Sequence, residues 1–155
     1  MADRLQVLGW REWVELPDLK LGPIKAKVDT GARTSCLLAF ELDPFERDGE
    51  SWIRFKVHPV QKDNSVVVQC EAPVFDQRPV TDSGGHTEQR YVIRTRLEIG
   101  AWQQAVEMTL TGRDTMRFRM LIGRTTMKAG GFVVNPAISY QAGRKRRKKS
   151  KGSKK

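Results

Sequence analysis

The chain has 155 residues and a formal net charge of +10, a length that suits one domain around a single core. Nine basic residues and no acidic one lie in Arg144–Lys155, so this segment accounts for all but one of the ten net charges. A folded domain that reads DNA or RNA usually spreads its basic excess over one face, so the composition argues against such a surface. It predicts a nearly neutral domain over residues 1–142 and a disordered basic tail over residues 143–155.

Membrane and secretion signals are also missing from the sequence. The longest stretch without a charge, residues 129–143, has 15 residues, whereas a bilayer span needs about 20 apolar ones. Residues 1–10 hold no apolar core of the secretory type. We therefore expect a cytoplasmic protein with no membrane contact, in which Cys36 and Cys70 are free thiols.

Alternation of apolar and polar residues with period two predicts strands along most of the chain. In chain order, these strands cover residues 24–28, 53–57, 66–70, 91–99, 106–110 and 118–122. Turn residues separate them at Pro17-Asp18, Gly22-Pro23, Asp48-Gly49, Asp63-Asn64, Ser83-Gly84-Gly85 and Gly130-Gly131. One short helix is expected over residues 124–129. Short strands at this spacing predict an all-β barrel or sandwich.

The tripeptide Asp29-Thr30-Gly31 directly follows the first predicted strand. It places a carboxylate on a tight loop, where glycine lets another part of the backbone approach closely. Two such carboxylates about 3 Å apart share a proton, so one can activate water while the other protonates a substrate carbonyl. The tripeptide occurs once, so a catalytic pair requires a second copy of the chain on a two-fold axis. In the alternative interpretation, Asp29 is a structural carboxylate that accepts backbone hydrogen bonds within its loop.

Three further segments complement the Asp29-Thr30-Gly31 tripeptide. The segment Met120–Arg124 resembles the one that threads beside the catalytic loop in pepsin-like and retroviral proteases. Residues 130–135 resemble the C-terminal strand that retroviral proteases use in their dimer sheet, and Val80–Tyr91, centred on Ser83-Gly84-Gly85, is the best candidate for a flap. A narrower resemblance rests on residues 7–14, 27–35, 88–93 and 117–124, which together are similar to a bacterial family labelled ATP-dependent zinc proteases and also described as RimB-type retropepsin-like peptidases.

This resemblance implies a retropepsin-like closed barrel with one short helix after Gly123. It also implies a homodimeric aspartic peptidase that trims oligoglutamate from a ribosomal protein, opposite an ATP-grasp glutamate ligase that adds it. Asp29 would be catalytic, with Thr30 and Gly31 supporting the pair of carboxylates. The alternatives are a non-catalytic ribosome- or RNA-associated β-barrel module and a peptidase of general protein turnover.

Substrate-binding candidates follow the tripeptide and flank the other motifs: Ala32, Arg33, Thr34, Ser35, Arg90 and Arg124. A planar guanidinium matches a carboxylate with two parallel hydrogen bonds, so the arginines suit an acidic substrate. Arg33 could equally form a structural ion pair, and for Arg124 we favour a structural role. Thr34 and Ser35 could offer hydroxyls to the substrate or cap the loop.

No metal or cofactor is expected. Zinc needs three or four N, S or O ligands, and the chain offers His58, His86, Cys36 and Cys70 without a C-x-x-C or H-E-x-x-H motif. A phosphate-cradling G-x-x-x-x-G-K-[ST] loop is also missing, so any ATP dependence would belong to the ligase. The basic tail either contacts RNA, the ribosome or another polyanion, or only solubilises the protein.

Overall fold

The computed structural model describes residues 6–81, 84–112 and 117–143; the basic run Arg144–Lys155 lies outside the described residues. Its elements are β1 (Gln6–Leu8), β2 (Arg11–Leu16), the 3-10 helix η1 (Pro17–Leu19), β3 (Leu21–Val28), β4 (Ser35–Leu38), β5 (Phe40–Arg47), β6 (Glu50–Val57), β7 (Val68–Pro73), β8 (Asp76–Thr81), β9 (Thr87–Ile99), β10 (Trp102–Thr111), β11 (Met120–Ile122), α1 (Arg124–Gly130) and β12 (Phe132–Val134).

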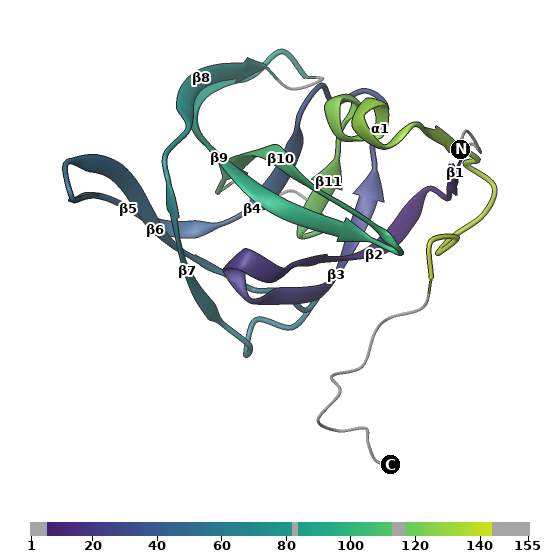
Figure 1. Ribbon diagram of the computed structural model, residues 1–155, viewed down its shortest axis with the longest axis horizontal. Coiled ribbons are helices and arrows are strands. Elements are labelled where there is room, and N and C mark those ends of the chain that lie inside the picture. The colour runs from purple at the N-terminus through teal and green to yellow at the C-terminus, as the bar shows by residue number, and fades with distance from the viewer. Residues whose placement is uncertain (1–5, 82–83, 113–116, 144–155) are drawn as a thin grey trace.

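Six strands close into a barrel in the order β10-β4-β11-β3-β2-β9, with β9 pairing back onto β10 (Figure 1). The predicted all-β closed barrel with one short helix after Gly123 is therefore confirmed. Strand β11 runs parallel to β3 on one side and antiparallel to β4 on the other. This arrangement brings the end of β11 beside the end of β3, although the two strands are far apart in the sequence.

Alternating side chains fill the barrel. In β2, Glu12, Val14 and Leu16 are buried while the residues between them are partly exposed. The largest fully buried side chains come from most of the strands: Phe55, Leu8, Leu16, Ile24, Leu37, Ile53, Ile93, Leu97, Ile99, Met108, Leu110 and Met120. Each such apolar side chain contributes about 1.5–3 kcal/mol when it leaves water, so the barrel is a packed core.

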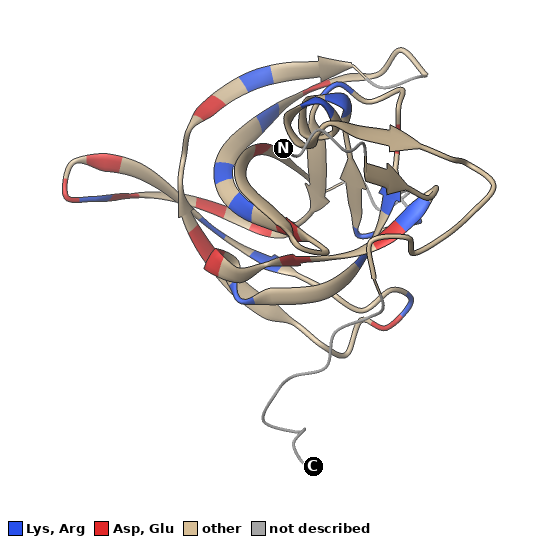
Figure 2. Ribbon diagram, turned by 45° about the vertical axis from the view of Figure 1, so that its right-hand side comes forward, with Lys and Arg blue, Asp and Glu red and all other residues tan. Residues whose placement is uncertain are grey.

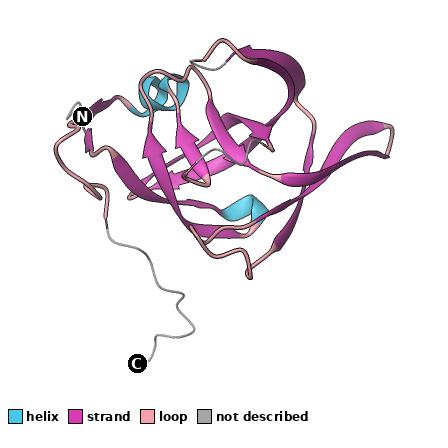
Figure 3. Cartoon of the chain, turned by 180° about the vertical axis from the view of Figure 1, so that it is seen from behind, coloured by secondary structure: helices cyan, strands magenta, loops and turns pink. Residues whose placement is uncertain are grey.

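The other elements surround this barrel. Strands β5, β6 and β7 form a separate sheet, whose β5–β6 hairpin projects from the body (Figure 1). Helix α1 and η1 lie on opposite sides of the molecule (Figure 3). Strands β1 and β12 form a parallel two-stranded sheet. Among the described residues there is no helix with the length and apolar character needed to span a membrane.

The six predicted strands correspond to β3, β6, β7, β9, β10 and β11, and the predicted helix corresponds to α1. Strands β1, β2, β4, β5 and most of β8 were not predicted. Strands β1 and β4 are short, and β5 and β8 lie largely on the surface. The expected turn at Gly22-Pro23 is wrong, since both residues lie within β3. The pairing of β3 with β2 shifts register between Val14 and Leu16. This irregularity accommodates Gly22 and Pro23 within β3.

Candidate active site

The loop after β3 presents the carboxylate of Asp29 at the surface. The backbone N–H of Asp29 donates to the carbonyl of Ile122 at the end of β11 (2.9 Å). The side-chain Oδ1 of Asp29 accepts a hydrogen bond from the N–H of Gly31 (2.9 Å). A Cβ on Gly31 would lie 3.2 Å from that same oxygen, so the close turn favours glycine. Asp29 is half-buried and Thr30 is exposed, so the carboxylate is fixed in direction and still accessible.

Gly123 lies against the far end of the same loop. A Cβ on Gly123 would lie 2.5 Å from the carbonyl carbon of Thr34 and 2.8 Å from the nitrogen of Ser35. The N–H groups of Arg124 and Thr125 donate to the carbonyls of Ala32 and Arg33, both at 2.9 Å. The resemblance to pepsin-like and retroviral proteases placed Met120–Arg124 beside the Asp29 loop, and these contacts confirm that position.

Ser35 faces the interior and bridges the loop to helix α1. Its side chain is fully buried, its Oγ accepts from the N–H of Gly123 (2.9 Å), and it also pairs with the Oγ1 of Thr126 (2.7 Å). Of the two roles left open for Ser35, the geometry supports the structural one.

The hairpin of β8 and β9 is the candidate flap. The two strands pair antiparallel up to Thr81 and Thr87, whose hydroxyls are 2.7 Å apart. Gly84 and Gly85 lie in the turn, whereas Ser83, part of its predicted centre, is outside the described residues. The hairpin was expected at Val80–Tyr91, and the strands begin earlier, at Asp76.

A family model described as "Retropepsin-like aspartic endopeptidase RimB" matches residues 7–145. The chain belongs to this RimB-like family. The match spans every element from β2 to β12, including the Asp29 loop and Gly123. The family description supports a peptidase of the aspartic type.

Curated relatives of the RimB-like chain carry another name. It is 50% identical over 137 residues to a "Probable alpha-L-glutamate ligase" of Parasynechococcus marenigrum, 41% identical to one of Shewanella pealeana and 42% identical to one of Desulfotalea psychrophila. The matches cover 88%, 94% and 89% of this chain but only 29%, 31% and 30% of those relatives. The chain therefore spans about a third of their length.

A solved structure shows the same fold. The crystal structure of a protein of unknown function from Legionella pneumophila superposes with a TM-score of 0.74 at 23% identity, and the match covers 88% of this chain and 98% of that one. The likeness concerns the fold alone.

Two of the predicted substrate-binding arginines are engaged within the RimB-like chain. Arg124 donates from Nη1 to the carbonyl of Thr30 (2.9 Å), in line with the structural role we favoured. The Arg90 side chain is only 10% exposed and its Nε donates to Glu88 (2.6 Å). Its Nη1 lies 3.5 Å from the Sγ of Cys36 and 3.4 Å from the Oγ1 of Thr109. A substrate could reach Arg90 only if this network opened.

The same network sets the charge state of two neighbouring groups. Burial raises the pKa of the Cys36 thiol, so this group stays protonated. Burial acts in the same direction on Glu88, but hydrogen bonds from Thr111 and Arg90 outweigh it and lower the pKa of the Glu88 carboxyl. The part of β9 next to the turn of the candidate flap therefore holds an ionised Glu88–Arg90 pair.

Arg33 and Thr34 remain available in the RimB-like fold. Both line a pocket of about 290 Å³ that also contains Arg78, Arg94 and Thr125. The sequence analysis missed Arg78 and Arg94, because their strands gave no sign of facing the Asp29 loop. Ala32, by contrast, is half-buried and bonded on both sides, its N–H to the carbonyl of Asp29 (3.1 Å) and its carbonyl to Arg124.

The role of Glu12, like those of Arg78 and Arg94, was not predicted from the sequence. Its side chain is fully buried, and its two carboxylate oxygens accept backbone N–H groups from Gly9 (2.6 Å), Gln141 (2.9 Å) and Ala142 (2.9 Å). Glu12 shares the inward parity of Val14 and Leu16, and this placement of an acid among core positions was the available signal. Its carboxylate fixes the C-terminal segment onto the start of β2.

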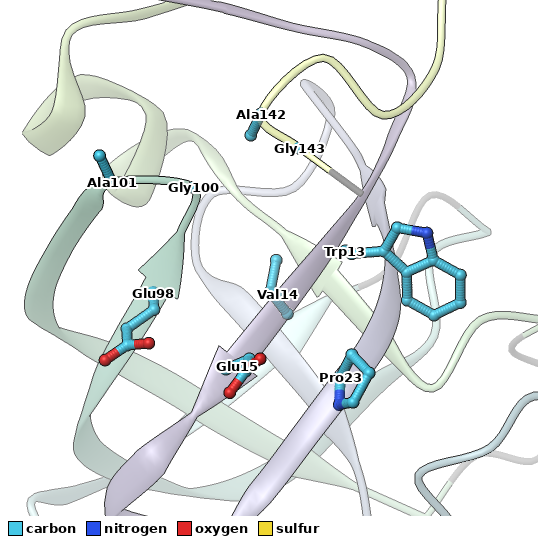
Figure 4. Close-up of a pocket in the computed structure, with 9 residues that line it drawn as sticks. All are labelled: Trp13, Val14, Glu15, Pro23, Glu98, Gly100, Ala101, Ala142 and Gly143. Carbon is cyan, nitrogen blue, oxygen red and sulfur yellow. The ribbon is translucent and has the colours of Figure 1, made fainter. Parts of the chain in front are cut away.

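A larger pocket lies away from the Asp29 loop. It measures about 380 Å³, and Figure 4 shows its lining, where the side chains of Glu15 and Glu98 lie on one side and that of Trp13 on the other. None of the predicted site residues lines it. Asp29 itself is half-buried on the loop after β3 and does not line this pocket.

The donor set does not fit a zinc ion. Over residues 6–81, 84–112 and 117–143, no three His, Cys, Asp or Glu side chains are grouped closely enough to hold a metal. The ring of His58 stacks on Phe40, and its Nδ1 lies 3.1 Å from the carbonyl of Val66. His86 is exposed in the flap, and Cys36 and Cys70 are buried free thiols.

Proposed function

We propose that this chain is an aspartic peptidase that works as a homodimer and shortens oligoglutamate tails on a ribosomal protein. The observation that carries the proposal is the Asp29 loop, which presents one fixed and accessible carboxylate at the junction of β3, β11 and α1. Family membership supports the chemistry of this carboxylate. The chain supplies one Asp-Thr-Gly, so the second carboxylate would come from a second copy.

In the proposed dimer, the two Asp29 carboxyls share one proton, because two like charges at close range cannot both ionise. The ionised member takes a proton from a water molecule, which attacks the peptide carbonyl carbon, while the protonated member donates to the carbonyl oxygen. When the resulting tetrahedral intermediate collapses, the C–N bond breaks and the leaving amine takes up the proton that the first Asp29 accepted from water. A hydroxyl of the intermediate returns a proton to the second Asp29 as the new carboxyl group forms. The balance is one water consumed per peptide bond, with no covalent enzyme intermediate.

The β1–β12 sheet is the surface we assign to dimer contact. It has two strands, so each has an outer edge with backbone groups that a second copy could pair with. Val7 and Val133 are 42% and 40% exposed on it. The sheet is joined to the Asp29 loop through Trp10, whose N–H donates to Ile138 and whose carbonyl accepts from Val28, both at 2.9 Å. Dimer contacts at this sheet would therefore influence the position of Asp29.

The substrate class is supported by the relatives. Proteins named for glutamate ligation contain a region like this chain within about a third of their length. The shared region links a peptidase-type domain to proteins named for glutamate ligation. We therefore propose that the peptidase removes the glutamates that a ligase adds. A ribosomal substrate and a glutamate ligase as partner would place the reaction in the cytoplasm.

Intact-protein mass spectrometry tests the activity. A carrier protein with a C-terminal oligoglutamate tail is incubated with wild type, with Asp29→Asn and with Asp18→Asn, a control in which an exposed acid of η1 is neutralised. Wild type and Asp18→Asn should remove glutamates, and Asp29→Asn should remove none. Removal by Asp29→Asn, or removal blocked by a metal chelator, would refute the aspartic mechanism.

Mixing the wild type with Asp29→Asn tests the shared site. If both copies must supply Asp29, an equal mixture after subunit exchange retains about a quarter of the wild-type activity, because a quarter of randomly formed dimers carry two intact loops. Independent sites would retain about half. Sedimentation velocity at the assay concentration establishes that dimers are present.

A further inference from the structure

A basic pocket lies beside the Asp29 loop, where the loop meets helix α1 and strands β8, β9 and β10. It measures about 290 Å³ and is lined by Arg33 and Thr34 from the loop, Arg78 from β8, Arg94 from β9 and Thr125 from α1, among others. This volume suits one side chain of a ligand better than a whole ligand. Figure 2 shows bands of basic residues along the curved strands next to α1.

The lining carries an excess of positive charge. It contains three guanidinium groups and a single carboxylate, that of Glu107. Arg78 donates to Glu107 (3.1 Å) and to Asp76 (2.9 Å). Glu107 is the cross-strand partner of Arg94, but its ion pair is with Arg78. Across the described residues, no carboxylate lies within ion-pair distance of Arg94 or Arg33, so two positive charges in the pocket have no counter-charge in this part of the chain.

The Arg94 guanidinium contacts an aromatic ring. Its central carbon lies 5.4 Å from the centre of the exposed Phe75 ring, a cation–π distance. Over residues 6–81, 84–112 and 117–143, its N–H groups have no carboxylate partner and are available to a ligand. The remaining lining includes the hydroxyl residues Thr34 and Thr125 and the apolar Val106 and Ala129. Positive charge, hydroxyls and a small apolar surface together suit a short side chain that ends in a carboxylate.

We propose that this pocket binds the side-chain carboxylate of a substrate glutamate next to the bond that Asp29 cleaves, with Arg94 and Arg33 as the binding residues. The inference rests on the proposed function and deepens it, because it assigns the preference for acidic substrates to a defined subsite. Arg33 reaches the pocket four residues after Asp29, and its carbonyl is fixed by Thr125. A ligand in the pocket would thus lie close to the catalytic loop.

Binding is measured in the Asp29→Asn background, where no cleavage occurs. Fluorescence anisotropy at physiological salt compares a labelled tetraglutamate peptide with its tetraglutamine equivalent. The control for Arg94→Gln is Arg96→Gln, which removes an exposed arginine two residues further along β9 that does not line the pocket. Both variants keep the basic tail, so nonspecific attraction to that tail is the same in both.

Arg94→Gln should raise the Kd of the glutamate peptide about tenfold, the loss expected for one charged hydrogen-bonded contact. It should leave the Kd of the glutamine peptide unchanged. Arg96→Gln should change either Kd by less than about threefold, and Arg94→Lys should retain part of the affinity because it keeps the charge. An equal effect of Arg94→Gln and Arg96→Gln, or an equal loss for both peptides, would overturn the proposal.

The two proposals fail in different ways. Binding that depends on Arg94 without cleavage by the wild type would retain the subsite and remove the peptidase function. Cleavage of the glutamate peptide with a KM unaffected by Arg94→Gln would retain the peptidase and remove the subsite.

Discussion

Replacing Gly123 with alanine tests whether the contact between helix α1 and the Asp29 loop positions the site. The added Cβ would lie 2.5 Å from the carbonyl carbon of Thr34, whereas carbon atoms in contact are separated by about 3.5–4.0 Å, so the backbone must move by about 1 Å. Overpacking of this kind costs about 1–3 kcal/mol. The movement also strains the bond from Gly123 to Ser35, worth about 1 kcal/mol. We therefore expect a loss of about 2–4 kcal/mol in the free energy of unfolding, with loss of peptidase activity.

The matched control is Gly112→Ala. Its Cβ would meet the carbonyl oxygen of Ala39 at 3.5 Å, an ordinary contact, so a change below about 0.5 kcal/mol is expected. Urea denaturation of both variants at one protein concentration, with m-values compared, gives the free energies. The reasoning is wrong if Gly123→Ala unfolds within about 0.5 kcal/mol of Gly112→Ala and cleaves its substrate normally.

Three further predictions concern the surrounding structure. Glu12→Gln should destabilise the fold by about 2–4 kcal/mol, because three backbone N–H groups lose a buried carboxylate acceptor; hydrogen exchange at Gln141 and Ala142 should accelerate, and unchanged exchange there would contradict this role. The lowered pKa of Glu88 means that its ionised form stabilises the folded state above its ordinary pKa of about 4.5, so urea denaturation should show the stability advantage of wild type over Glu88→Gln shrinking as pH falls below that value. An advantage that grows towards about pH 3 would have the wrong sign. Deleting Arg144–Lys155 should flatten the salt dependence of RNA binding without altering cleavage of a neutral peptide, whereas an unchanged salt slope would place the polyanion contact elsewhere.

Several features of this protein could be predicted from local sequence. Period-two alternation predicted β3, β6, β9 and β10, because a strand with one buried face has to alternate. The resemblance of Asp29-Thr30-Gly31 and Gly123-Arg124 to segments of retroviral proteases predicted that the two segments meet, and the structure joins them through backbone hydrogen bonds. The position of the basic residues in Arg144–Lys155 predicted that most of the net charge lies in the tail and that the domain is nearly neutral.

Tertiary structure decided which of the predicted substrate-binding arginines are available to a substrate. The sequence does not distinguish the availability of Arg33, Arg90 and Arg124. In the structure, Arg90 pairs with Glu88 and Arg124 donates to the carbonyl of Thr30, whereas Arg33 lines a pocket. That pocket also requires Arg94, which sits 61 residues after Arg33 and reaches it only because β9 and β10 wrap round to the loop before β4. Alternation fixes the face of a strand on which a side chain lies, and only the closed barrel fixes which distant charges share that face or neutralise one another.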